Sequence, residues 1–399
     1  MTDRKTDRVP VVIVGAGPAG LMLSHLLHLA GIRSTVLEAR GRDAIEATIR
    51  AGVLEQNTVD LMVETGLGDR MLREGHVHEG FEFRFSGESR RIDLKALTGR
   101  SITVYPQHEV LKDLINARLS ADGDLRFEVK DVQVRDVETA PRVSFTDAAG
   151  IAHEIEAEFV AGCDGFYGAC RHAIPSGTRR DYQRIYPFGW FGILAEAPPS
   201  APELVYARHE RGFALISTRS PGVQRMYFQC DPAEPVEDWS QARIWEELQT
   251  RVSGSGFRLN EGPVFQKNVI AMRSFVCEPM RHGRLFLAGD AAHIVPPTGA
   301  KGLNLAVADV WVLARALERF FRSGTHEGLD AYSETALRRV WRAQHFSWWM
   351  TSMLHRFEGA TEFDHRRQLA ELDMVTRQEA ASRTVAENYA GLPLGAFGG

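Results

Sequence analysis

A glycine-rich turn near the start of the chain is its most restrictive feature. Residues 15–20 read GAGPAG and directly follow residues 10–14, a short β-branched run of the kind buried in a parallel sheet. Residues 21–29 then have the broad apolar face of a helix, and a second strand at residues 34–37 ends at Glu38. Strand, turn, helix, strand and acid in this order predict a βαβ unit that binds a dinucleotide.

The positions of the turn have physical reasons. Gly15 permits the tight turn, Gly17 lets a pyrophosphate approach the backbone, and Gly20 allows the helix to pack closely on the strand. The helix N-terminus, which includes Ala19, presents free N–H groups and a favourable dipole to the phosphates, and Glu38 can accept hydrogen bonds from a ribose. A glycine-rich turn without a ligand is the alternative, and the motif does not choose between NAD and FAD.

Two later segments narrow the choice of cofactor. Residues 161–165 (AGCDG) follow an alternating run at 155–160, and residues 283–293 (GRLFLAGDAAH) form another strand that ends at Gly-Asp. Either segment alone is compatible with an ordinary strand end. The three motifs in this order resemble the flavoprotein hydroxylase family, the class A flavin monooxygenases. The resemblance implies bound FAD, with Asp164 serving both FAD and a passing nicotinamide and Asp290 binding the ribityl chain.

The resemblance covers essentially the whole chain. It is closest to members that hydroxylate 4-hydroxybenzoate, and the strings that carry it are residues 49–56, 186–190, 211–215, 295–304, 346–352 and 387–389. It implies that NAD(P)H reduces FAD, and that a flavin C4a-hydroperoxide formed with O2 transfers oxygen ortho to the phenol, giving 3,4-dihydroxybenzoate. Related hydroxylases of 3-hydroxybenzoate, 4-aminobenzoate or a dihydroxybenzoate stay open as alternatives, as does a non-catalytic FAD-binding protein.

The strand expected at residues 213–219 carries the candidate substrate receptor. Its alternation places Ser217 and Arg219 on one face, and Tyr227 alternates with Arg225 on the strand that follows. A guanidinium flanked by two hydroxyls is a good receptor for a carboxylate on an aromatic ring. A polar sheet face in water is the alternative for the strand taken alone. The resemblance implies that Ser217, Arg219 and Tyr227 bind the substrate carboxylate.

A proton path is the second part of the implied site. The resemblance implies that Tyr206 contacts the substrate phenol, that Tyr389 contacts Tyr206, and that His78 connects this pair to solvent. It also implies that the Pro297 carbonyl lies near the substrate hydroxyl. Taken singly, these tyrosines suit a core with satisfied hydroxyls, and the histidine suits an ordinary loop. The path would remove the phenolic proton, because free phenols titrate only near pKa ~10.

The remaining candidate ligands of the two cofactors come with the resemblance. For FAD they are Arg50, Gln107, Arg225, Gly302, Leu303 and Asn304, and for the nicotinamide they are Arg40, Arg42, Tyr167 and Arg273. A Gly-rich loop before the helix expected at residues 305–321 also suits the negative N1–C2=O side of reduced flavin. Arg40 and Arg42 can meet a 2′-phosphate, but a solvated charged loop is an equal alternative, and Glu46 would repel a phosphate. The choice between NADPH and NADH therefore stays open.

The expected architecture is α/β, with a Rossmann-like, discontinuous FAD-binding domain, a β-sheet substrate domain and C-terminal helices. The expected boundaries are 1–181 and 273–330 for the FAD domain, 182–272 for the substrate domain, and 331–399 for the helical region. This region includes an aromatic-rich helix at 329–357 and a helical stretch at 364–388 that returns Tyr389 to the site. The resemblance also implies a homodimer.

Composition limits the other classes of function. The net charge of −5 over 399 residues gives no basic footprint for nucleic acid. No apolar run approaches the ~20 residues needed to cross a bilayer, and the polar first ten residues lack the apolar core of a secretory signal. The four cysteines show no metal-ligand spacing, so no metal site is expected. Composition therefore favours a cytoplasmic protein without nucleic-acid or membrane partners, and the resemblance implies an enzyme that acts on a small aromatic acid and O2.

Overall fold

The computed structural model describes residues 7–48 and 52–397, and its first sheet contains the expected βαβ unit. Strands β18, β11, β1, β2 and β8 are neighbours in this order and pair in parallel, while β17, β10 and β9 add antiparallel pairs. The strand bounds are β1 Asp7–Val14, β2 Ser34–Leu37, β8 Asp124–Arg126, β9 Lys130–Arg135, β10 Arg142–Thr146, β11 Ala152–Gly162, β17 Arg281–His282 and β18 Leu285–Leu287. The predicted α/β fold class is confirmed.

Helix packing on this sheet explains the apolar run that precedes the glycine turn. Val11, Val12 and Ile13 are fully buried, as expected for a parallel strand that is covered on both faces. Helix α1 (Pro18–Leu29) begins with a proline, whose missing N–H costs nothing at a first helical position. It packs against α8 (Gly302–Ser323), the helix that follows the predicted loop. Two helices from opposite ends of the chain therefore meet beside the turn.

A second sheet forms the other half of the molecule, and its strand order is β19-β16-β12-β15-β14-β13-β5-β6. The bounds are β5 Gly80–Phe85, β6 Glu88–Asp93, β12 Arg180–Glu196, β13 Leu204–His209, β14 Gly212–Ser220, β15 Val223–Cys230, β16 Val264–Glu278 and β19 His293–Ile294. This sheet is not confined to the expected range 182–272. Strands β5 and β6 come from the N-terminal part of the chain. They join this sheet because β5 pairs in parallel with β13 and β6 pairs with β5.

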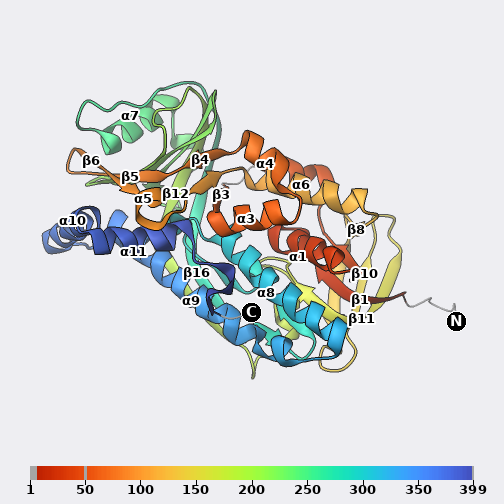
Figure 1. The fold of residues 1–399 in the computed structure, drawn as a ribbon. Helices are drawn as coiled ribbons and strands as arrows, with labels where there is room; N and C mark the ends of the chain where they lie inside the picture. Colours follow the sequence, from red (N-terminus) through yellow and green to blue (C-terminus); the bar gives the residue numbers. More distant parts are fainter. Residues whose placement is uncertain (1–6, 49–51, 398–399) are drawn as a thin grey trace.

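Two groups of helices cover the two faces of this large sheet (Figure 1). On one face, α7 (Gln241–Val252) packs through Ile244 and Leu248 on the even-numbered side chains of β14, such as Ile216. On the other, α9 (Glu327–Leu354), α10 (Glu362–Arg377) and α11 (Glu379–Ala390) pack on the odd-numbered side chains. Strand alternation thus separates an α7 core from the face that carries the candidate site.

A small third sheet, β3-β7-β4, joins the two large ones. Its strands are β3 Val53–Glu55, β4 His76–His78 and β7 Ile102–Val104. The remaining helices are α2 Arg42–Ala47, α3 Gln56–Glu64, α4 Gly68–Glu74, α5 Leu94–Thr98 and α6 Gln107–Ser120, with 3-10 turns η1 Cys170–Ala173, η2 Val236–Asp238, η3 Gly289–Ala291, η4 Pro297–Gly299 and η5 Leu394–Phe397. The linking sheet brings His78 and the start of α6 close to the substrate sheet.

The stretch expected to be helical at 364–388 is two helices, α10 and α11. Gln378 between them is extended (φ −95°, ψ 120°), and the Ser382 hydroxyl donates to the Val375 carbonyl 2.8 Å away across the break. The change of direction lets α11 pack beside α5 while its last turn places Tyr389 in the core. Among the described residues, no helix is both long enough and apolar enough to span a membrane.

Candidate active site

The glycine turn leaves open space at one position and none at the other two. A Cβ on Gly15, whose φ is +102°, would lie 2.3 Å from the Cys163 carbonyl oxygen, and one on Gly20 would lie 1.9 Å from the Gly15 oxygen. A Cβ on Gly17 would meet nothing within 4 Å. Gly15 and Gly20 are therefore required by the packing of the protein itself, whereas Gly17 faces the space that a pyrophosphate would occupy.

Three acids lie at strand ends around this turn. Glu38 accepts from the N–H of Ala16 at 2.7 Å and that of Arg40 at 3.0 Å, so it fixes the turn as well as facing a ribose site. Asp164 accepts from the Cys170 N–H at 2.9 Å, but its Oδ1 is buried with no partner in the described structure, and burial raises its pKa. Asp290 lies in η3 and is exposed. A buried carboxylate oxygen without a donor fits a ligand that brings hydroxyl or amide donors.

The start of α8 supplies free N–H groups but fewer side-chain contacts than expected. Gly302 and Leu303 occupy its first two positions, and a Cβ on Gly302 would meet nothing within 4 Å. The Asn304 side chain is used internally: it donates to the Val53 and Ala300 carbonyls and accepts from the Glu55 N–H and the Thr58 hydroxyl. Asn304 can therefore meet a cofactor only through its backbone.

Three further FAD candidates are Gln107, Arg50 and Arg225. Gln107 is the first residue of α6 and lies beside Gly52. A Cβ on Gly52 would lie 1.9 Å from the Tyr105 carbonyl oxygen, so the chain packs tightly here. Arg50 lies outside the described residues. Arg225 is buried, and its Nη1 has no hydrogen-bond partner in the described structure. The open glycine positions, the unpaired Asp164 oxygen and the first turn of α8 together fit FAD.

One row of side chains crosses the substrate sheet. Phe83, Tyr206, Leu215 and Tyr227 are successive partners across β5, β13, β14 and β15, and the next partner in the row is Gly192 on β12. A Cβ on Gly192 would lie 2.8 Å from the Tyr227 ring, so the glycine makes room for that ring. Sequence reasoning missed Gly192, although a glycine inside a strand can signal a close approach.

The expected carboxylate receptor lies next to this row. Ser217 pairs with Arg225 and donates its hydroxyl to the Arg225 carbonyl at 2.8 Å, so it must turn before it can donate to a ligand. Burial, together with the nearby charge of Arg225, lowers the pKa of Arg219 to about 10. The Arg225 guanidinium lies 5.2 Å from the Tyr227 ring centre. A buried and a half-buried arginine, together with a phenol hydroxyl, form a place where an anion would be stabilised.

Tyr206 and Tyr389 come together as expected. Their hydroxyl oxygens are 2.6 Å apart, both rings are buried, and burial raises the pKa of each phenol above its usual value. The Tyr389 ring also packs on Phe81, with ring centres 4.4 Å apart. A short hydrogen bond between two buried hydroxyls can pass a proton with little movement of either ring.

His78 and Pro297 are placed less directly. His78 is buried at the end of β4, its Nδ1 has no partner within the described ranges, and burial lowers its pKa to about 4, so the imidazole is neutral. No hydrogen bond joins it to either tyrosine of the pair among the described residues, so a connection to Tyr389 needs an intermediate such as water. The Pro297 carbonyl accepts from the Ala300 N–H at 2.9 Å, which leaves one lone pair for another donor.

An aromatic wall behind Tyr227 was not anticipated. Trp190 donates its indole N–H to His355 Nε2 at 2.7 Å, and the Trp190 and Tyr227 ring centres are 5.1 Å apart. Burial lowers the pKa of His355 to about 3, so the ring is neutral and can accept this bond. Trp190 and His355 are 165 residues apart, and no local pattern pairs them.

The nicotinamide candidates do not gather in one place. Arg273 lies over the Phe166 ring at 4.7 Å, and the neighbouring Tyr167 is 86% exposed. Arg40 contacts the Glu38 carboxylate at 3.2 Å. Arg42 contacts Glu46 at 2.5 Å and Asn116 at 2.7 Å. Both arginines expected near a 2′-phosphate therefore already contact an acid.

Comparison with known proteins identifies the family. A family model described as "FAD binding domain" matches residues 8–347. The p-hydroxybenzoate hydroxylase of Acinetobacter baylyi is 48% identical over 391 residues, which are 98% of this chain and 96% of that protein. The chain belongs to the class A flavoprotein hydroxylase family. It is a flavin-dependent monooxygenase with FAD as its cofactor, and NAD(P)H is the typical co-substrate of this family.

More distant proteins resemble the chain in sequence or in fold. The rifampicin monooxygenase of Streptomyces venezuelae is 28% identical over 329 residues, covering 81% of this chain and 67% of that protein. The solved structure of p-nitrophenol 4-monooxygenase from Pseudomonas putida DLL-E4 matches with a TM-score of 0.81 at 21% identity, covering 97% of this chain and 99% of that one. At that identity, the likeness shows the shared architecture.

The glycine turn gives a first testable prediction for FAD binding. Gly20→Ala is expected to lower the melting temperature of the apoprotein, because the new methyl meets a backbone oxygen at 1.9 Å and overpacking costs about 1–3 kcal/mol or more. Gly17→Ala is expected to keep that melting temperature and weaken FAD binding at least tenfold. Calorimetry and flavin-fluorescence titration measure the two effects. A Gly17→Ala apoprotein as unstable as Gly20→Ala would contradict the assignment of open space to the cofactor.

Proposed function

We propose that this chain is a 4-hydroxybenzoate 3-monooxygenase, which forms 3,4-dihydroxybenzoate from 4-hydroxybenzoate, O2 and NAD(P)H. The observation that carries the proposal is the 2.6 Å bond between the buried hydroxyls of Tyr206 and Tyr389, on the sheet face that also presents Tyr227 and Arg219. A proton acceptor at one end of a row and a cation near the other suit an acid whose phenol lies opposite its carboxylate. The Acinetobacter relative, named for this substrate, supports the same reaction.

The spacing of the row agrees with a para-substituted ring. Tyr206 and Tyr227 are separated by one strand, which places their backbones about 10 Å apart. Arg219, with Tyr227 and Ser217, would hold the carboxylate, and Tyr206 would then face the hydroxyl. Bound FAD would supply the redox chemistry that activates O2 for transfer to the ring.

The protein residues then make the ring electron-rich. Tyr206 would take up the phenolic proton as it passes its own proton to Tyr389 through their shared bond, and Tyr389 would release its own proton through water toward His78 and solvent. The cations Arg219 and Arg225 would favour the phenolate form of the bound substrate, because positive charge stabilises an anion in a water-poor site. The buried wall of Trp190 and Tyr227 would exclude water around the reacting ring.

The test is a substrate-dependent oxidation assay. We expect the purified, FAD-loaded protein to oxidise NAD(P)H much faster with 4-hydroxybenzoate than without it, and to form 3,4-dihydroxybenzoate detected by chromatography. Oxidation without hydroxylated product would make the acid an effector only. Stimulation by 3-hydroxybenzoate, 4-aminobenzoate or a dihydroxybenzoate instead would reassign the substrate, and no stimulation by any of them would favour a non-catalytic FAD-binding role.

The paired arginines predict the nicotinamide preference. Because Arg42 is engaged by Glu46 and Arg40 by Glu38, we expect NADH to be used at least as well as NADPH. Glu46→Gln, which removes one negative charge beside Arg42, is expected to raise kcat/KM for NADPH roughly three- to tenfold and leave the value for NADH unchanged. Exposed Glu64→Gln serves as the matched control. A wild type with a strong NADPH preference would contradict this prediction.

A subunit contact is proposed for the C-terminal helical region. We infer a homodimer from the resemblance of the chain to its family. On α9, the Trp341 and Trp348 side chains are 42% and 41% exposed, which is unusual for tryptophan and suits a subunit contact. Light scattering of the holoprotein distinguishes a dimer from a monomer.

A further inference from the structure

His108 lies between the candidate substrate arginine and an acidic cluster. It is the second residue of α6, next to Gln107. Its Nδ1 is 3.4 Å from Arg219 Nη2, and its Nε2 is 3.0 Å from Glu109 Oε1. The His108 side chain is 14% exposed, so these two contacts take up both polar atoms of a largely buried ring. None of the three motifs of the chain includes His108.

The carboxylate decides which nitrogen of the ring carries the proton. An ionised carboxylate can only accept, so Nε2 must donate to Glu109 and Nδ1 must present its lone pair to Arg219. Burial opposes ionisation of Glu109, but bonds from Lys112 and Arg70 outweigh it and lower its pKa to about 2. Donors and acceptors therefore run in one direction, from Arg219 through His108 to Glu109.

The protonation state of His108 agrees with this direction. Burial lowers the pKa of His108, Glu109 opposes the shift, and the nearby charges of Arg219, Lys112 and Arg70 add to it. The ring is therefore neutral at neutral pH and keeps the lone pair that faces Arg219. The position of the ring at the first turn of α6 disfavours a cation further, because that end of the helix carries partial positive charge.

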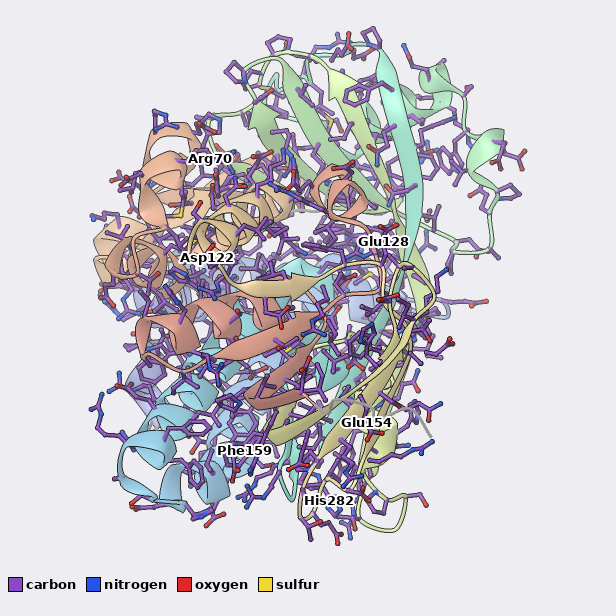
Figure 2. All side chains as sticks on the ribbon, turned by 90° about the vertical axis from the view of Figure 1, so that its right-hand side faces the viewer. Arg70, Asp122, Glu128, Glu154, Phe159 and His282 are labelled. Carbon is purple, nitrogen blue, oxygen red and sulfur yellow. The ribbon has the colours of Figure 1, made fainter. Side chains whose placement is uncertain are left out.

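The far end of this chain of contacts is fixed by neighbouring elements. Arg70, labelled in Figure 2, reaches from α4 to Glu109 and also contacts Asp113 at 2.7 Å. Asp113 accepts from the Tyr105 hydroxyl at 2.8 Å. Two helices and the loop before α6 thus hold Glu109, and Glu109 in turn holds the His108 ring in one orientation.

We propose that His108 is a positioning residue that aims the Arg219 guanidinium at the carboxylate of the aromatic acid. The inference rests on the proposed function, because it assigns Arg219 the substrate carboxylate. A guanidinium on a long side chain loses rotamer freedom when it binds, and a partner that fixes it beforehand reduces that loss. His108 is also the neighbour in sequence of Gln107, a candidate FAD contact. A cofactor bound at Gln107 would therefore also fix the start of α6, which carries the His108 ring.

Two replacements of similar size separate the roles of the two ring nitrogens. In His108→Asn, the side-chain oxygen can take the place of Nδ1 and still accept from Arg219. In His108→Gln, the longer amide replaces Nε2 and leaves no acceptor at the Nδ1 position. We expect the Kd of 4-hydroxybenzoate, titrated by flavin absorbance in the holoenzyme, to rise roughly tenfold in His108→Gln and less than about threefold in His108→Asn.

Further readouts distinguish aiming from a structural effect. The kcat at saturating substrate should be similar in the two variants, so that the difference lies in KM. Neutral 4-hydroxybenzamide, which lacks the carboxylate, should bind both variants with equal affinity. Exposed His28→Gln, at the last turn of α1, is the control for loss of a histidine. Melting temperatures of the holoproteins verify that both variants fold.

The outcomes separate this inference from the function on which it rests. Equal Kd values for His108→Asn and His108→Gln, in a wild type that binds 4-hydroxybenzoate, would overturn the aiming role and leave the proposed reaction standing. An equal loss of affinity for the acid and the amide would also overturn it. A wild type that neither binds nor hydroxylates the acid would overturn the proposed function, and this inference with it.

Discussion

Replacement of Tyr206 by phenylalanine is expected to reduce the rate of 3,4-dihydroxybenzoate formation roughly 10²- to 10³-fold while FAD stays bound, because positioned proton transfer contributes about that much. The hydroxyl of Tyr206 lies 2.6 Å from the Tyr389 hydroxyl, in a core where both rings are buried. Without it, the substrate phenol loses the group that passes its proton on, because a carbonyl such as that of Pro297 can accept a hydrogen bond but cannot relay a proton. Tyr389→Phe is expected to give a smaller loss, since Tyr206 can still accept from the substrate but cannot pass the proton on.

Rapid-mixing measurement of product formation under O2, after reduction of the flavin, isolates this step from nicotinamide binding. In Tyr206→Phe the rate should rise with pH toward the pKa of the free phenol, because the substrate must then lose its proton without help. Tyr332→Phe is the matched control: this buried tyrosine donates to the Leu287 carbonyl at 2.7 Å, in the other core. It should lose stability and keep its rate per bound FAD. A Tyr206→Phe rate equal to wild type would show that the proton leaves by another route.

Local pattern was enough to predict the βαβ unit on the cofactor side of the molecule. The strand at 34–37 and the turn at 15–20 were placed correctly because their periodicity and glycines act over a few residues. Helix α8 was also located, starting three residues earlier than expected. The division of the C-terminal helical stretch into α10 and α11 was not predicted. The break at Gln378 depends on how α11 packs beside α5, and no proline or glycine marks it in the sequence.

The contacts that shape the substrate side are long-range. The alternation of β14 predicted which residues share a face, but the fit of Tyr227 over Gly192 depends on the register of β12 with β15. His108 and Arg219 are 111 residues apart and meet only because the linking sheet brings α6 to the substrate sheet. A motif shared with a family also does not show which atoms of a residue contact the cofactor. The Asn304 side chain, for example, is hydrogen-bonded within the protein.

A buried ion pair beneath the site carries the largest expected effect on stability. Lys301 Nζ lies 2.6 Å from Glu55 Oε1 and 3.0 Å from the Tyr389 carbonyl, and the Lys301 and Glu55 side chains are 5% and 11% exposed. Lys301→Met would leave the Glu55 carboxylate buried without its cation, which costs about 3–5 kcal/mol. We expect a matching fall in the free energy of unfolding, measured by urea titration of the apoprotein.

The pair, and not either charge alone, is what the fold requires. Combining Lys301→Met with Glu55→Gln is therefore expected to recover most of the lost stability, because no unpaired buried charge remains. The double variant would still lack the donor to the Tyr389 carbonyl, so α11 should hold that residue less firmly and hydroxylation should stay slower than in wild type. Additive losses in the double variant would show that Lys301 stabilises the protein mainly through Tyr389 and the rings around it.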